Sequence, residues 1–149
     1  MSPIYIFTLS LLALAALLAL IRGSGWERST AAVLVLGWTL SWLTPFDFKT
    51  PPWPAIIADA CVFLFLLYGA LQSRRLWMAV AAGFQCLVLA THYVFVERLD
   101  LDNWAYISAY YVWNIGVIGT LCAASLLRPR KARLSGRLGV PKEDDGQST

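Results

Sequence analysis

The sequence predicts an all-α fold, a bundle of five membrane-spanning helices. Of the 149 residues, 58% are hydrophobic and only 14% are charged, whereas soluble domains carry about 25% charged residues. The mean hydropathy is +0.61. Five apolar stretches fill the first 127 residues, and each approaches the roughly 20 residues that a helix needs to cross a hydrocarbon layer. We therefore expect lipid to be the solvent of this chain.

The five predicted helices cover residues 4–21, 29–46, 54–71, 76–96 and 104–127. The first lacks the basic start and the A-x-A cleavage site of a signal peptide, so we expect it to be retained. The second is the weakest, because Thr39, Ser41 and Thr44 interrupt it. Its alternative is a position in the membrane interface, which would leave four spans. The third follows several prolines, and Pro54 fits the first turn of a helix, where a missing N–H matters little.

The fourth helix starts after a turn of only four residues, and the fifth ends where the composition changes abruptly. Beyond residue 127 the chain is polar and basic, without apolar periodicity, which predicts a disordered tail. Residues 1–127 are thus predicted to form the transmembrane bundle, and residues 128–149 a cytoplasmic tail. Close to the membrane, the basic side chains of this tail are expected to contact anionic lipid. They are Arg128, Arg130, Lys131 and Arg133.

The distribution of positive charge predicts the orientation. Ten of the 12 Lys and Arg residues fall in segments 22–28, 72–75 and 128–149, and the other two are Lys49 and Arg98. Basic loops stay on the cytoplasmic side, so the N-terminus is predicted outside and the C-terminus in the cytoplasm. Nine Arg against three Lys, with abundant Leu and Ala, indicate a GC-rich bacterial genome. The predicted location is therefore the cell inner membrane.

Four polar side chains fall inside the predicted spans: Asp59, Gln85, His92 and Asn114. Such groups are costly in hydrocarbon unless they are paired or hydrated. Asp59 and His92 lie at the same depth, about 8 Å from the outer face by helix rise, and we expect them to approach each other or to share a water. Gln85 and Asn114 lie near the midplane, and we expect them to hydrogen bond across the fourth and fifth helices.

Each of these residues also has a purely structural interpretation. Asp59 lies near the positive end of the third helix, where it could reach solvent or Lys49. His92 could satisfy a backbone carbonyl or a Tyr hydroxyl. Gln85 and Asn114 are typical of polar contacts that hold membrane helices together. Small residues four positions apart on one helix predict where another helix can pack closely. These positions are Ala15 and Ala19, Ala79 and Gly83, and Gly116, Thr120 and Ala124.

Together with nearby aromatic residues, the polar side chains predict an outward-opening cavity that is aromatic above and polar below, as in small-molecule sites. Tyr106 belongs to the aromatic set. The predicted ligand or proton site consists of Asp59, His92, Gln85, Asn114, Tyr110, Tyr111, Trp113 and Trp38.

The sequence favours a non-enzymatic membrane protein that binds or passes a small solute or a proton. The alternative is an accessory or assembly subunit of a larger membrane complex, or a homo-oligomer. The chain lacks the H-E-x-x-H, G-x-S-x-G and C-x-x-C patterns of common enzymes. A single His and three widely spaced Cys predict neither a haem cofactor nor a metal site. No catalytic residue and no nucleic acid partner is expected.

Overall fold

The computed structural model describes residues 3–44, 50–97 and 103–127, and these residues form a helical bundle. The helices are α1 (Pro3–Arg22), α2 (Gly25–Leu43), α3 (Trp53–Ser73), α4 (Leu76–Glu97) and α5 (Asn103–Leu126). Within the described residues, four of them are long and apolar enough to cross a membrane: α1, α3, α4 and α5. Helix α2 is not among these four, because Glu27, Arg28 and several hydroxyl side chains lower its hydropathy.

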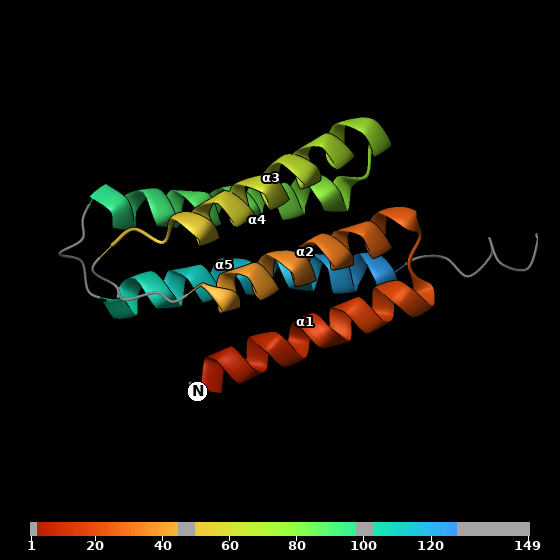
Figure 1. Cartoon of the computed structure of the whole chain (residues 1–149). Helices are drawn as coiled ribbons and strands as arrows, with labels where there is room; N and C mark the ends of the chain where they lie inside the picture. Colours follow the sequence, from red (N-terminus) through yellow and green to blue (C-terminus); the bar gives the residue numbers. More distant parts are fainter. Residues whose placement is uncertain (1–2, 45–49, 98–102, 128–149) are drawn as a thin grey trace, which may run out of the picture.

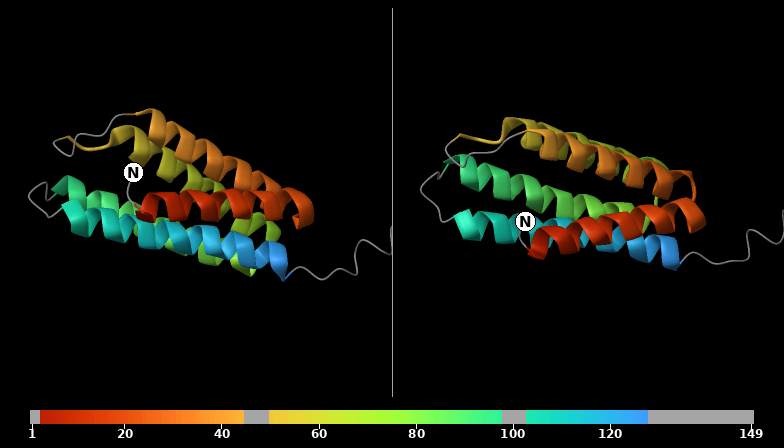
Figure 2. Two further views of the ribbon diagram at one scale, coloured as in Figure 1. Left: turned by 90° about the horizontal axis from the view of Figure 1, so that it is seen from below. Right: turned by 60° about the horizontal axis from the view of Figure 1, so that its bottom comes forward.

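The helices lie side by side and alternate in direction along the chain (Figure 1). Each helix packs against the next in sequence, and α5 also packs against α1, which closes the ring; two further views show the same arrangement (Figure 2). The α1–α2 turn at Gly23 and Ser24 and the α3–α4 turn at Arg74 and Arg75 lie at one end of the bundle. We call this the turn end. Helices α3 and α5 begin at the opposite end.

The sequence-based boundaries agree with the structure to within two residues at the ends of α1, α3, α4 and α5. The second helix differs, since it begins at Gly25 rather than at residue 29. Ser24 and Glu27 form a capping box in which the Glu27 carboxylate accepts the Ser24 backbone N–H at 2.7 Å. This cap satisfies a donor that a helix start would otherwise leave unpaired, and so extends α2 toward the turn end.

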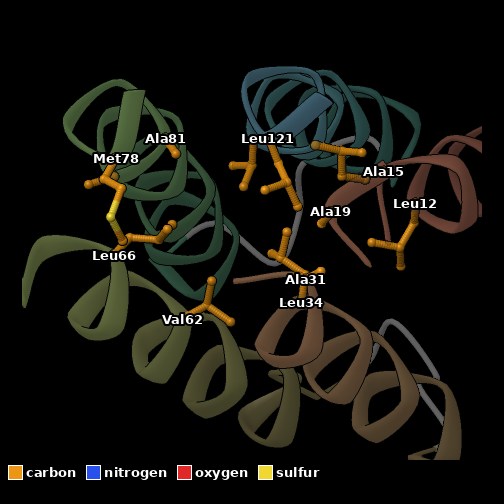
Figure 3. Packing of buried hydrophobic residues seen from close by; sticks show 13 residues of the cluster. Leu12, Ala15, Ala19, Ala31, Leu34, Val62, Leu66, Met78, Ala81 and Leu121 are labelled. Atoms are coloured by element: carbon orange, nitrogen blue, oxygen red, sulfur yellow. The ribbon is translucent and has the colours of Figure 1, made fainter. Parts of the chain in front are cut away.

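An apolar core fills the centre of the bundle, with contributions from every helix (Figure 3). Ala15 and Ala19 of α1 are fully buried, which confirms them as close-packing positions. At Gly116 a Cβ atom would lie only 2.6 Å from the Phe84 ring, so α5 also approaches α4 through a small residue. Within this chain the prediction was wrong for Ala79 and Gly83, which are exposed on the outer surface of α4.

A buried carboxylate joins the two turns. Glu27 is 2% exposed, and one of its oxygens accepts from Arg75 Nη1 at 2.7 Å. The Ser24 hydroxyl hydrogen bonds to the other oxygen, and Arg75 Nη1 also donates to this hydroxyl at 3.1 Å. Burial alone would raise the pKa of Glu27, but the hydrogen bonds from Ser24 and the charge of Arg75 outweigh it and hold the pKa below its usual value. Glu27 therefore remains ionised at neutral pH.

Candidate functional site

The Asp59 carboxylate connects α3 to α4. Asp59 is six residues into α3, about 9 Å along the helix axis. Its Oδ1 accepts a hydrogen bond from Gln85 Nε2 at 2.9 Å, and its Oδ2 lies 2.8 Å from His92 Nε2. Gln85 Nε2 also donates to the backbone carbonyl of Asp59 at 3.3 Å. Both carboxylate oxygens therefore have partners on the facing helix, and the predicted approach of Asp59 and His92 is confirmed.

His92 extends this network to α5. The hydroxyl of Tyr106 lies 3.0 Å from His92 Nδ1, on the opposite side of the ring from Asp59. The Tyr110 ring centroid lies 5.4 Å from the imidazole centroid, tilted by 60°. Three helices thus meet at one imidazole, and the expected Tyr hydroxyl partner of His92 is present in addition to Asp59.

Burial makes the protonation of this network important. His92 and Gln85 are each 1% exposed, and Asp59 is 9% exposed. An ionised carboxylate accepts only, so an ionised Asp59 requires that His92 Nε2 carry a proton. The other ring nitrogen can then either accept from the Tyr106 hydroxyl, when the ring is neutral, or donate to it, when the ring is cationic. The hydroxyl satisfies both states because it can donate and accept.

Asn114 lies apart from the Asp59 network. Its Nδ2 donates to the backbone carbonyl of Tyr110, one turn earlier on α5, at 2.9 Å. The predicted bond between Gln85 and Asn114 is therefore wrong. Gln85 faces α3 instead, where its Nε2 donates to the side chain and the backbone carbonyl of Asp59.

The space beside Asp59 is much smaller than the predicted cavity. Its lining includes Asp59, Trp38, Tyr110 and Asn114, and its volume is about 10 Å³. That is about the minimum for one water molecule, whereas pockets for small molecules usually have about 300 to 1,000 Å³. Ser41, near the end of α2, lines this space on the side away from the turn end, and Leu34 and Val62 line it on the side toward the turn end.

The remaining predicted residues lie outside this space. Tyr111 packs against Trp38 and Tyr110, with ring centroids 6.3 and 5.9 Å away. Trp113 lines a different feature, an apolar groove of about 280 Å³ on α4 and α5 that Tyr106 and Phe95 also line. The structure thus separates the predicted aromatic set into residues that cover Asp59 and residues that face this groove.

Sequence reasoning missed the burial of Glu27. The signal was available, because Ser24 and Glu27 have the S-x-x-E spacing of a capping box. Tyr106 was assigned to the cavity wall, but the structure makes it a direct partner of His92. No spacing rule could have shown this contact, since the two residues lie on different helices whose rotation the sequence leaves open.

Comparison of the chain with models of protein families, with curated proteins and with solved structures finds no match. Within residues 3–44, 50–97 and 103–127, no group of three or more His, Cys, Asp or Glu side chains is arranged to hold a metal ion. The chemistry of the site must therefore be derived from its own geometry.

Proposed function

We propose that this chain is a small, non-enzymatic membrane protein that takes up and releases a proton at the buried Asp59–His92 pair. The observation that carries the proposal is the contact of 2.8 Å between a carboxylate and an imidazole, both buried among helices of membrane-spanning length. The energy of a buried ionisable pair depends strongly on its protonation. Such residues inside membrane helices commonly mark proton sites.

The surroundings favour a proton over a larger solute. The space at Asp59 has room for about one water molecule, which is enough to deliver a proton but too little for an organic molecule. The partners of His92 accommodate either charge state of the ring, because the Tyr106 hydroxyl reverses its role as the proton arrives. Proton uptake therefore requires no rearrangement of the helices.

The apolar core favours binding over passage across the bilayer. Val62, Leu66 and Met78 are buried core residues, and they lie between Asp59 and the turn end along α3 and α4. Asp59 lies only six residues from the start of α3 at the opposite end of the bundle, and Ala55 and Ser41, which lie still nearer that end, also line the small space at Asp59. We therefore propose that the pair exchanges protons with that end, which the charge distribution assigns to the outer face.

The experiment is a pH titration of the protein in lipid nanodiscs, with ¹⁵N-labelled histidine observed by NMR. The chain contains one His, so the spectrum reports His92 alone. We expect the ring nitrogens to change protonation reversibly, and the midpoint to move in the Asp59→Asn variant. Thr30→Val, which alters a hydrogen bond within α2, is the matched control and should leave the midpoint unchanged. Ring nitrogens whose protonation and chemical shifts both stay constant until the protein unfolds would show that neither His92 nor its partner Asp59 changes charge, and would overturn the proposal.

We also propose five spans with the N-terminus outside and the C-terminus in the cytoplasm of the cell inner membrane. Helix α2 has 19 residues, or about 28 Å, and lies alongside the other four helices (Figure 2). The two turns at the turn end carry Arg22, Arg28, Arg74 and Arg75, which supports a cytoplasmic location for that end. The predicted lipid contacts of Arg128, Arg130, Lys131 and Arg133 lie outside the described residues and remain a proposal.

Protease accessibility of terminal epitope tags tests this topology. In spheroplasts of a bacterial host, an N-terminal tag should be cleaved and a C-terminal tag should be protected. Equal accessibility of the two tags would contradict five spans and would support the alternative in which α2 lies in the interface.

A specific observation supports the second candidate function, a subunit of a larger membrane complex. Ala79 and Gly83 form a small-residue surface on α4 that points out of the bundle, and a Cβ atom at Gly83 would meet nothing within 4 Å. Such a surface allows another helix to approach closely. Gly83→Leu should therefore preserve the monomer and abolish its assembly in native mass spectra. The control is Ala123→Leu, at an exposed position on α5. A monomeric wild type would exclude self-assembly of this chain, and unchanged assembly of Gly83→Leu would exclude this surface as the contact.

A further inference from the structure

The two ends of the Gln85 amide are used unequally. Its Nε2 donates both to the Asp59 carboxylate, at 2.9 Å, and to the Asp59 backbone carbonyl, at 3.3 Å. Its Oε1 is fully buried and has no hydrogen-bond partner among the residues that the structure describes. A buried amide oxygen without a donor is unfavourable and rare, so this atom requires an explanation.

The chemistry of Asp59 supplies one. An ionised carboxylate needs donors, which the Gln85 N–H group provides. A protonated carboxyl group has an O–H that needs an acceptor instead. A primary amide carries a donor and an acceptor on the same terminal carbon, so a half turn about its last side-chain bond exchanges them. After that rotation, the oxygen that now lacks a partner would accept the O–H of Asp59.

We propose that Gln85 is a positioning residue that adapts the site to both protonation states of Asp59 by rotating its amide. This inference rests on the proposed uptake of a proton at the pair. A hydronium ion gives up its proton and becomes water, an O–H bond forms on Asp59 Oδ1, and no bond of the chain breaks. In each state one amide group lacks a partner, the oxygen when Asp59 is ionised and the nitrogen when it is protonated. The rotated amide also gives up the 3.3 Å hydrogen bond from Nε2 to the Asp59 backbone carbonyl, so rotation becomes favourable only when Asp59 carries the proton.

The other groups around Asp59 do not provide the same function. His92 of α4 and Tyr106 and Tyr110 of α5 are the titratable side chains that the structure places near this carboxylate. Helix α2 lines the small space beside Asp59 with residues that include Trp38 and Ser41. Neither of these two side chains changes its protonation within the pH range of the experiment. His92 contacts Oδ2, whereas Gln85 contacts Oδ1. Gln85 is therefore the partner placed to follow a proton on Oδ1.

The experiment is pH-difference infrared spectroscopy of the full chain in nanodiscs, with ¹³C at the side-chain carbonyl of glutamine. The chain contains Gln72, Gln85 and Gln147, and the band that is missing in Gln85→Met identifies Gln85. We expect this band to shift reversibly over the same pH range in which the carboxyl band of Asp59 appears. In Asp59→Asn, which cannot gain the proton, the Gln85 band should not depend on pH.

The outcomes are separable. A carboxyl band of Asp59 that appears while the Gln85 band stays constant overturns the role of Gln85 and leaves proton uptake intact. Absence of any Asp59 carboxyl band overturns proton uptake at this carboxylate, and the role of Gln85 with it. A fixed amide would respond only to the loss of charge at Asp59, which weakens its N–H hydrogen bond, whereas rotation brings a carbonyl without a donor into a hydrogen bond with the Asp59 O–H and lowers the carbonyl frequency.

Discussion

The energetic coupling between Asp59 and His92 can be measured with a double-mutant cycle. The single variants are Asp59→Leu and His92→Phe, which preserve approximate volume and leave the aromatic packing around position 92 in place. If both partners are charged, their attraction at 2.8 Å is about 6 kcal/mol at an effective dielectric constant of about 20. Desolvation cancels most of this energy. Hydrogen bonds between membrane helices average about 0.6 kcal/mol in such cycles, with a maximum near 1.7.

We therefore expect a coupling of about 2 kcal/mol if the ring is cationic and about 1 kcal/mol if it is neutral. The assay is reversible unfolding in mixed micelles with increasing sodium dodecyl sulfate, followed by circular dichroism. Thr30→Val combined with His92→Phe serves as the control, because Thr30 donates within its own helix and should be additive. A coupling for Asp59 and His92 below about 0.5 kcal/mol, the usual error of additivity, would refute this reasoning.

Two further predictions concern the turn end. Gly23→Ala places a Cβ atom 2.3 Å from the Ala19 backbone oxygen, whereas Gly25→Ala meets nothing within 4 Å. We therefore expect Gly23→Ala to lower the free energy of unfolding by about 1 to 3 kcal/mol, and Gly25→Ala to leave it unchanged or raise it. Unfolding in detergent measures both variants, and equal effects would contradict the expected clash at Gly23. Because its pKa is lowered on folding, ionised Glu27 stabilises the protein above its unfolded pKa, near 4.5, and this contribution is lost as pH falls through the lower folded value. Glu27→Gln should thus be less stable than wild type by about 2 kcal/mol at neutral pH, after allowance for the partial exposure of Arg75. This difference in stability should vanish in acid. A difference that does not depend on pH would argue against the ion pair.

The helix pattern was largely predictable because hydrocarbon thickness and helix rise constrain both the length and the ends of an apolar segment. Helix α2 shows where this reasoning fails. Its start is determined by the hydrogen bonds of Ser24 and Glu27, so it extends past the apolar segment by four residues. Hydropathy identifies the part of a helix that prefers lipid, whereas caps determine where the helix begins.

Within the site, depth was predictable and rotation was not. Asp59 and His92 were predicted to meet because residue counting from the ends of two adjacent helices places them at one level. Gln85 and Asn114 also share a level, but Gln85 faces α3 and Asn114 bonds within α5. Which neighbour a side chain faces depends on how every helix is turned in the bundle, and that follows from packing of the whole core. Gln85 and His92 are seven residues apart, which places them on one face of α4, and both are buried; this periodicity could not choose between α3 and α5.

The partners of the two buried carboxylates suggest a division of roles between the ends of the bundle. Glu27 is paired with Arg75, whose guanidinium remains charged at any pH that a cell experiences. Only strong acid, which protonates the Glu27 carboxylate, can neutralise one member of this pair. The Glu27–Arg75 contact therefore links the two turns at every pH that a cell experiences. Asp59 is paired with His92, and an imidazole can change its charge near neutral pH. Exchanging the two partners would test this reasoning: His92→Arg should fix the charge at Asp59 and remove the proposed pH response, whereas Arg75→His should make the turn end sensitive to pH. If unfolding of the two variants showed the same pH dependence as wild type, the identity of the partner would not explain the difference between the two ends.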